Sequence, residues 1–150
     1  FTFEIESITR FWKELHGARE GWTPSSKARR SISARLREGM NLHDARDAML
    51  GGVRSSWHRG DNDNGDLCDE FFRAFLPDGL DKFRRRLETF ERNLANRIVW
   101  QKNGRYFCDA SNPKQKGESI DLGPVGVPSM RERGINGDNS GSTESRNRES

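Results

Sequence analysis

The sequence predicts a mainly α-helical fold: a small domain of four or five helices over residues 3–97, a β-hairpin over residues 98–108 and a disordered tail over residues 111–150. Apolar residues recur every three or four positions through residues 3–97, which is the period of amphipathic helices. The pair Asn103-Gly104 then separates two β-prone runs, a strong hairpin signal. The remaining segment is rich in Gly, Ser, Asn, Pro and charge, a composition that cannot form a core.

The first helix is expected from Glu4 to His16. Gly17 follows directly and provides a typical helix end. The apolar residues of this segment stand at helical spacing and define its buried face: Ile5, Ile8, Phe11, Trp12 and Leu15. A loop comes next, in which Trp22 is placed to anchor the following helix in the manner of a hydrophobic staple.

A second, strongly basic helix is expected between a start at Thr23 or Ser25 and a stop at Gly39. Its apolar residues recur every four positions and mark one stripe: Ala28, Ile32 and Leu36. Cationic side chains cover most of the remaining surface: Lys27, Arg29, Arg30, Arg35 and Arg37. Such a helix indicates a phosphate-binding surface, although a cationic face that merely keeps the protein soluble has the same pattern.

A third helix is expected to begin after Asn41, a good N-cap, with Asp44 placed to complement the helix N-terminus. Its apolar residues continue at helical spacing: Leu42, Ala45, Met49, Val53 and Trp57. Gly51 and Gly52 interrupt this pattern at about 1 kcal/mol each relative to alanine. They either allow close helix packing or mark a kink. The spacing of Trp57 favours a buried anchor over a base-stacking residue.

The elements beyond the third helix follow from turn signals and aromatic spacing. A polar turn over residues 58–66 leads into a short aromatic helix over residues 67–76. After the breaker at residues 77–79, a long amphipathic helix is expected over residues 80–94. In the hairpin, Trp100 should lie opposite Phe107 and Gln101 opposite Tyr106. The aromatic residues of the two helices over residues 67–94 are assigned to the core.

The composition sets further bounds. The chain has 150 residues, of which 31% are hydrophobic and 33% charged, so it suits one domain with a lean core and a tail. The net charge of +3 is unevenly distributed, with basic segments on either side of an acidic stretch over residues 61–70. There are two cysteines without zinc-ligand spacing, no signal peptide and no membrane-spanning run, which favours a soluble intracellular protein. The first residue, Phe1, indicates a fragment or a processed product.

No catalytic, metal or cofactor site is predicted. The segment from Asp61 to Asp66 resembles a calcium loop, but its spacing places Gly60 and Phe71 at the first and last ligand positions. A metal-dependent nuclease could be drawn from His58 and the aspartates of this loop, Asp61, Asp63 and Asp66, yet they crowd one flexible segment. No Walker-type phosphate loop is present. The chain is therefore predicted not to be an enzyme.

DNA binding is the leading functional prediction from the residues. The basic helix supplies the phosphate contacts, Arg54 and Arg59 extend them, and Trp22 is a base-stacking candidate. The alternative is a protein-interaction module without DNA binding of its own, in which the aromatic helix and the acidic loop dock a partner.

Several of these residues also resemble the conserved phage C-terminal domain of replisome-organiser and DnaD-like phage or prophage replication proteins. The resemblance covers roughly residues 5–90. It rests on a Lys/Arg-rich helix behind a Thr-Pro, a Trp-containing segment and a Leu-Pro turn into a last helix. The matching residues are Thr23, Lys27, Arg30, Ile32, Arg35, Leu36, Gly39, Leu42, Asp44, Trp57, Leu80 and Phe83. Two features depart from the family: the long acidic loop, and Leu76, where many members carry an arginine before the proline.

The resemblance implies a part in replication initiation in the bacterial host cytoplasm. Such proteins bind the phage origin, as duplex or opened single strand, and recruit the replicative helicase or its loader. An N-terminal winged-helix domain usually reads the sequence in full-length members. This module would then supply non-specific DNA binding and protein contacts, as a monomer or a homo-oligomer.

Overall fold

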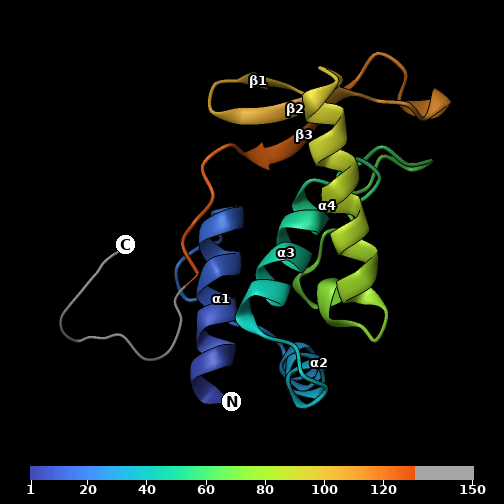
Figure 1. Cartoon of the computed structure of the whole chain (residues 1–150). Helices are drawn as coiled ribbons and strands as arrows, with labels where there is room; N and C mark the ends of the chain where they lie inside the picture. Colours follow the sequence, from blue (N-terminus) through green and yellow to red (C-terminus); the bar gives the residue numbers. More distant parts are fainter. Residues whose placement is uncertain (131–150) are drawn as a thin grey trace.

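The computed structural model describes residues 1–130 and is mainly α-helical, with a small sheet at one end (Figure 1). In this part of the chain the helices are α1 (Thr2–His16), α2 (Ser26–Arg37), α3 (Leu42–Val53) and α4 (Gly79–Ala95). The strands are β1 (Trp100–Lys102), β2 (Arg105–Asp109) and β3 (Ser119–Pro124), paired antiparallel in the order β1-β2-β3. Two short 3₁₀ segments are η1 (Phe71–Phe75) and η2 (Pro113–Gln115). The predicted fold class is confirmed.

The helix boundaries follow from the capping residues that the sequence indicates. The side chain of Ser25 accepts a hydrogen bond from the amide of Ala28 and begins α2. Asn41 and Asp44 form a reciprocal capping box at the start of α3, with bonds of 2.8 and 3.1 Å. Gly17 ends α1 in the left-handed conformation that glycine adopts without strain, at φ 61°.

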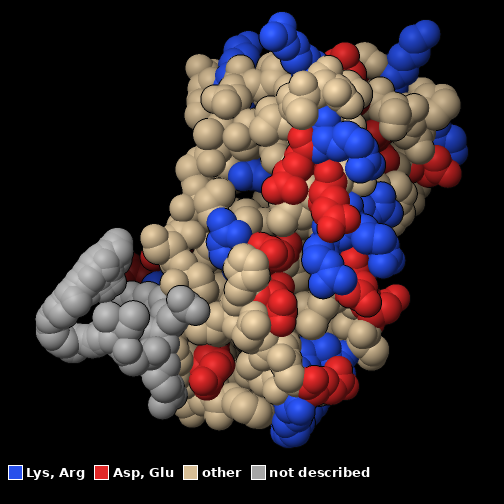
Figure 2. Space-filling view, viewed as in Figure 1, with Lys and Arg blue, Asp and Glu red and all other residues tan. Residues whose placement is uncertain are grey.

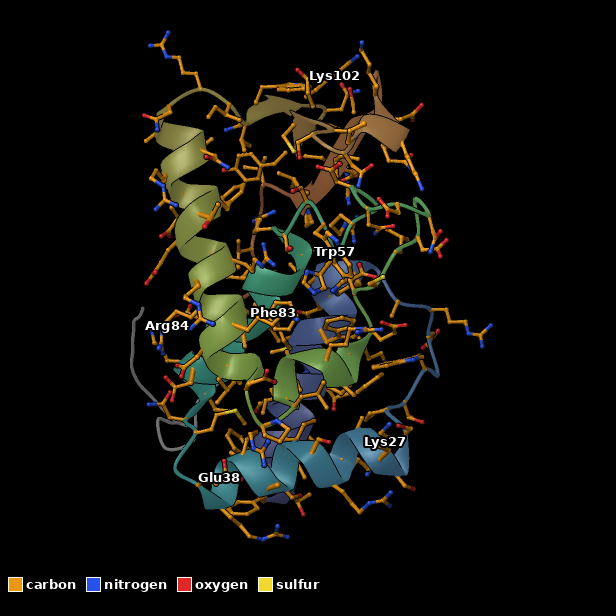
Figure 3. The ribbon with its side chains drawn as sticks, turned by 90° about the vertical axis from the view of Figure 1, so that its right-hand side faces the viewer. Lys27, Glu38, Trp57, Phe83, Arg84 and Lys102 are labelled. Carbon is orange, nitrogen blue, oxygen red and sulfur yellow. The ribbon has the colours of Figure 1, made fainter. Side chains whose placement is uncertain are left out.

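The main core lies between the helices. Helices α1, α3 and α4 stand side by side, and α2 crosses beneath them (Figures 1 and 3). The apolar stripe of each helix and the aromatics of η1 point into this space, so that Ile8, Phe11, Ile32, Met49 and Phe75 are almost fully buried. The aromatic residues over residues 67–94, which are predicted to lie in the core, are buried except for Phe72, which is half-buried.

Gly51 lets α3 and α4 approach closely. A Cβ atom at this position would lie 1.9 Å from the carbonyl oxygen of Phe83 on α4. Gly52 makes no such approach, since its nearest neighbour would be the Phe83 ring at 3.8 Å. The helix runs unbroken through both positions. Of the two interpretations of the glycine pair, close packing is therefore the correct one.

Two element predictions need correction. Helix α3 ends at Val53, and Trp57 lies beyond it in a turn with 46% of its surface exposed, so Trp57 is not a buried anchor. The predicted aromatic helix over residues 67–76 is reduced to η1, because the backbone of Leu67 pairs with that of Arg59 in an isolated bridge. Backbone pairing with a distant residue overrides the local helical spacing in this segment.

The sheet extends beyond the predicted hairpin. Trp100 pairs with Phe107 and Gln101 with Tyr106, as expected. However, β3 was not predicted, and the assignment of residues 111–150 to a disordered tail is wrong for residues 111–130. Within that polar stretch, Ile120 and Leu122 alternate toward α4 and are buried there. Residues 131–150 of the predicted tail lie outside the described residues.

The sheet is packed against the helical part rather than forming a separate domain. Its inner face, with Cys108, Ile120 and Leu122, shares a second apolar cluster with Phe90 of α4 and with Val99. The predicted division between residues 3–97 and 98–108 therefore crosses a continuous packed interface. None of the helices in residues 1–130 combines the length and the apolar character needed to cross a membrane.

Candidate nucleic-acid interface

Helix α2 presents a cationic outer face. Ala28 and Ile32 are buried against the core, which turns the opposite side of the helix to solvent. Four of the predicted phosphate-binding residues are exposed: Arg30 and Arg37 on that opposite side, and Lys27 and Arg29 on its two flanks, where Arg29 also lines a groove against α1. Arg30 and Arg37 are two turns apart, so they share one side of the helix at an axial separation of roughly 10 Å. Figure 3 shows α2 crossing the end of the molecule, with Lys27 near one terminus and Glu38 at the other.

The charges of this face are not neutralised by neighbouring acids. Within residues 1–130, the side chains of Arg29, Arg30 and Arg37 make no ion pair, and Lys27 lies 4.9 Å from the centre of the Phe72 ring. The nearby carboxylate of Glu38 pairs with Arg35 at 3.1 Å instead. Helix α4 differs, because its basic residues are interleaved with acids (Figure 2) and Arg84 pairs with Asp81. The outer face of α2 is thus an unpaired cationic surface.

Arg35 does not belong to that surface. It follows Ala28 by seven positions and therefore shares the buried side of α2, with 7% of its surface exposed. One guanidinium nitrogen donates to the carbonyl oxygen of Phe75 at 3.4 Å, and another bonds Glu38. The prediction of a free phosphate contact at Arg35 is wrong, since the residue joins α2 to η1. The apolar stripe itself carried the signal that would have identified this role.

Arg54 also has an internal role. Its guanidinium lies about equally close to the rings of Phe90 and Tyr106, at 5.0 and 4.8 Å, and donates to the carbonyl oxygen of Leu122 at 2.8 Å. Desolvation by burial lowers its pKa to about 10. The prediction that Arg54 extends a surface for DNA is therefore corrected, because the side chain fastens β3 to the helices.

Arg59 is similarly occupied. Its Nε donates to the carbonyl oxygen of Asp121 at 2.9 Å, and its guanidinium pairs with Asp69 and with the Asp121 carboxylate. The side chain is 12% exposed. Arg59 therefore connects the loop after α3 to the sheet and is not available as the predicted phosphate contact.

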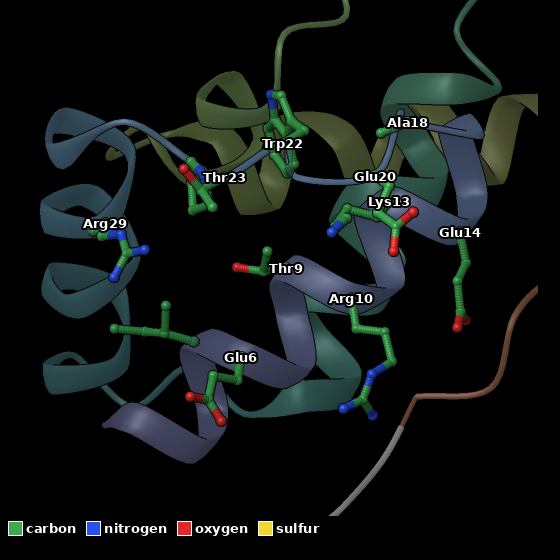
Figure 4. Close-up of a pocket in the computed structure, with 12 residues that line it drawn as sticks. Glu6, Thr9, Arg10, Lys13, Glu14, Ala18, Glu20, Trp22, Thr23 and Arg29 are labelled. Carbon is green, nitrogen blue, oxygen red and sulfur yellow. The ribbon is translucent and has the colours of Figure 1, made fainter.

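Trp22 lies in the wall of a groove between α1 and the loop that precedes α2 (Figure 4). The groove has a volume of about 710 Å³ and contains both signs of charge, including Glu6, Arg10 and Lys13. Trp22 is half-buried, with its ring perpendicular to that of Phe71 at 5.4 Å. Base stacking by Trp22 stays a prediction, and the packing shows that the residue also anchors the loop.

The acidic loop is built into the fold. The buried carboxylate of Asp61 accepts hydrogen bonds from the amides of Ser111 and Asn112 and from the Ser111 hydroxyl, each at 2.9 Å in its shortest contact. Desolvation raises the pKa of Asp61, but these bonds together outweigh it and hold the pKa below its usual range. Asp63 bonds the Asn112 side chain at 2.9 Å. The loop thus holds the segment that leads to β3.

These contacts leave the nuclease interpretation without a site in the described region. No group of three or more histidine, cysteine or acidic side chains in residues 1–130 is arranged to hold a metal ion. His58 is buried, and its Nδ1 lies 2.7 Å from the Ser55 hydroxyl, which is buried as well. The His58 ring packs between Trp57 and Phe83. This serine–histidine pair is closed to solvent and is structural.

His58 should make the stability of the protein sensitive to mild acid. Burial, followed by the charges of Lys82, Arg86 and Arg73, lowers its pKa from 6.5 to about 4. In this pH range the His58 side chain binds a proton in the unfolded chain but not in the folded chain. The free energy of unfolding is therefore expected to fall as the pH drops from about 6.5 toward 4. We expect His58 to account for about 1–2 kcal/mol of this loss by pH 5, measured by urea unfolding at several pH values.

The matched variants separate this effect from general acid unfolding. His58→Asn loses the ring contacts with Trp57 and Phe83, so this variant should be less stable than the wild type at neutral pH. Because asparagine does not titrate, its free energy of unfolding should depend less on pH between about 6.5 and 4. His16, whose pKa burial also lowers to about 4, contributes in the same direction. His43→Asn, at a side chain that is 71% exposed, should keep the full slope. An unchanged slope in His58→Asn would contradict the assignment.

Comparison of the chain with protein-family models, with curated proteins and with solved structures finds no match. The function must therefore be inferred from the geometry and charge of the chain itself.

Proposed function

We propose that the chain binds DNA through the outer face of α2, as a phage-type replication-initiation module. The observation that carries the proposal is the set of exposed cations on one helix, Lys27, Arg29, Arg30 and Arg37, that faces solvent without acidic partners. Unpaired cations at helical spacing match the repeating charge of a phosphate backbone, and contacts of this kind give affinity without sequence preference.

The place in replication comes from the resemblance to phage replication proteins. On that basis we propose that the bound DNA is origin DNA, as duplex or opened single strand, and that the module helps to recruit the replicative helicase or its loader. Lys27 and Arg30 belong both to the residues that resemble the family and to the exposed face of α2. The resemblance and the exposed charge thus point to the same side chains.

The alternative of a pure interaction module is weakened, because the features on which it rested are partly built into the fold, although Leu67 remains 61% exposed. Phe71 and Phe75 of the aromatic segment are buried, and the acidic loop bonds residues 111–112. A complex with a helicase that forms without DNA affinity and without salt dependence would nevertheless restore that alternative.

Charge reversal on α2 tests the proposal directly. The double variant Arg30→Glu/Arg37→Glu should abolish measurable DNA binding at moderate salt while keeping the helical circular-dichroism signal, because both side chains are exposed. For the wild type, the logarithm of affinity should fall linearly with the logarithm of salt concentration, by about 0.9 per phosphate contact on duplex DNA and about 0.7 on single strands. Fluorescence anisotropy with a labelled duplex and a labelled single strand measures both.

The matched control makes the same change of charge elsewhere. Arg85→Glu/Arg86→Glu alters two exposed arginines on α4, whose surface already mixes both signs of charge. This control should weaken binding far less than the α2 variant. Equal losses in the two double variants would reduce the effect to net charge and would overturn the assignment to α2.

A further inference from the structure

Helix α4 covers the inner face of the sheet and does not cover the outer face. Cys108 of β2 and Ile120 of β3 are buried on the covered face, together with Phe90. Since successive residues of a strand point to opposite faces, the neighbours of these residues share the outer face. On β1 and β2 this outer row contains Trp100, Lys102, Arg105, Phe107 and, at the far end of β2, Asp109.

Two aromatic rings form a platform in this row. Trp100 and Phe107 lie directly opposite each other across the strands, with ring centres 6.5 Å apart and ring planes inclined by 25°. Trp100 is 37% exposed, and Ile98, which precedes it by two positions, is 54% exposed. The packing that buries the other side of the sheet therefore leaves Trp100 exposed and Phe107 half-buried beside it.

Two cations stand beside the platform. Lys102 and Arg105 are directly opposite each other next to the hairpin turn, an arrangement that destabilises a sheet when both residues carry like charge. Arg105 bonds Asp121 at 2.8 Å but keeps 42% of its side chain exposed. Lys102 is exposed near the tip of the hairpin (Figure 3) and makes no ion pair within residues 1–130. Within the described residues, Lys102 is therefore the cation of this pair that is open to a phosphate, whereas Arg105 is shared with Asp121.

We propose that this outer face of the sheet binds single-stranded nucleic acid. Bases stack on Trp100 and Phe107, and the backbone phosphates lie against Lys102 and Arg105. Solvent-accessible aromatic rings beside cations are what a single strand requires, since every base has a stacking face and every backbone link carries a charge. A duplex keeps its bases stacked on one another and gains little from the platform. This second surface lies on other elements than α2 and goes beyond the function proposed for that helix.

Binding of a fluorescein-labelled oligothymidylate to the full chain tests the proposal. Trp100→Leu and Phe107→Leu keep an apolar side chain but remove the ring, and each should weaken single-strand binding by about 5-fold or more. Their affinity for a duplex of equal length should stay within about twofold of the wild type. Lys102→Ala changes no buried group and should lower the slope of log affinity against log salt by about 0.7 on the single strand.

Trp57→Leu is the matched control, because it removes an exposed tryptophan ring that lies outside the sheet. Unchanged oligothymidylate affinity in Trp100→Leu/Phe107→Leu, or an equal loss in Trp57→Leu, would overturn the proposal. Amide hydrogen exchange in β2 and β3 confirms that each variant keeps its sheet.

The α2 variant separates the two surfaces. If Arg30→Glu/Arg37→Glu loses duplex binding while the sheet variants leave the single-strand affinity unchanged, the function proposed for α2 stands and the sheet proposal falls. If the sheet variants lose single-strand binding and the α2 variant keeps both duplex and single-strand binding, the sheet proposal stands and the function proposed for α2 falls. Absence of any oligothymidylate binding by the wild type would overturn the sheet proposal and leave the duplex result to decide the role of α2.

Discussion

Replacing Gly51 by alanine should destabilise the protein by about 3 kcal/mol. The added Cβ would lie 1.9 Å from the carbonyl oxygen of Phe83, which is backbone within α4 and cannot rotate away. Helices α3 and α4 must therefore separate, and this loosens the contact that positions α4 beneath the sheet. The free energy of unfolding, measured by urea denaturation, reports the loss.

The neighbouring glycine provides the control in the same helix. Gly52→Ala places its Cβ at an ordinary contact distance of 3.8 Å from the Phe83 ring. Because alanine favours a helix over glycine by about 1 kcal/mol, this variant should match or exceed the wild type in stability. Similar destabilisation of both variants would mean that helix propensity or general crowding, rather than the approach at Gly51, governs this interface.

Removing the Arg54 side chain should lower the free energy of unfolding by about 3 kcal/mol. It should increase local opening of the sheet more than that of the helices. Truncation to alanine leaves the carbonyl oxygen of Leu122 without its donor and takes a desolvated cation away from two aromatic rings. Hydrogen exchange should show faster opening of β3 than of α1 and α3. Urea unfolding gives the total loss of stability.

Two further variants define what Arg54 contributes. Arg54→Leu keeps much of the packing and loses the hydrogen bond and the charge, so its stability should lie between those of the wild type and Arg54→Ala. Arg84→Ala removes an exposed arginine that pairs with Asp81 and should cost no more than about 0.5 kcal/mol. If Arg54→Ala were as stable as Arg84→Ala, Arg54 would not be a fastening residue.

The fold could be predicted from the sequence wherever the signal is local. Ser25, Asn41 and Asp44 begin helices through hydrogen bonds to residues within one turn, so their role is visible in the sequence alone. The same holds for Asn103 and Gly104, which adopt the positive φ angles of a tight hairpin. Elements that depend on distant residues were missed. Two buried apolar residues, Ile120 and Leu122, are too few to indicate β3 until β2 and α4 are in place.

The same distinction between local signals and contacts with distant residues applies to the candidate site. Lys27, Arg29, Arg30 and Arg37 were predicted to be exposed because the period of α2 fixes their side of the helix. Arg54 and Arg59 resembled surface cations, and their partners Leu122 and Asp121 lie more than sixty positions away in the chain. The outer face of the sheet was also missed as a functional surface, since the sequence predicted the hairpin only as an element that docks on the helices or remains loose.

The contacts of Asp61 bear on how the chain folds as it is synthesised. This carboxylate and its donors are separated by 50 residues, so Asp61 leaves the ribosome well before Ser111 does. At synthesis rates of about 5–20 residues per second, the loop after α3 stays for several seconds with the Asp61 carboxylate bonded to water rather than to Ser111 and Asn112. Helices α1 to α3 can assemble during that interval, whereas Arg54 and Arg59 find their partners on β3 at the end. Strand β3 therefore completes the polar interior of a domain whose helices are synthesised first.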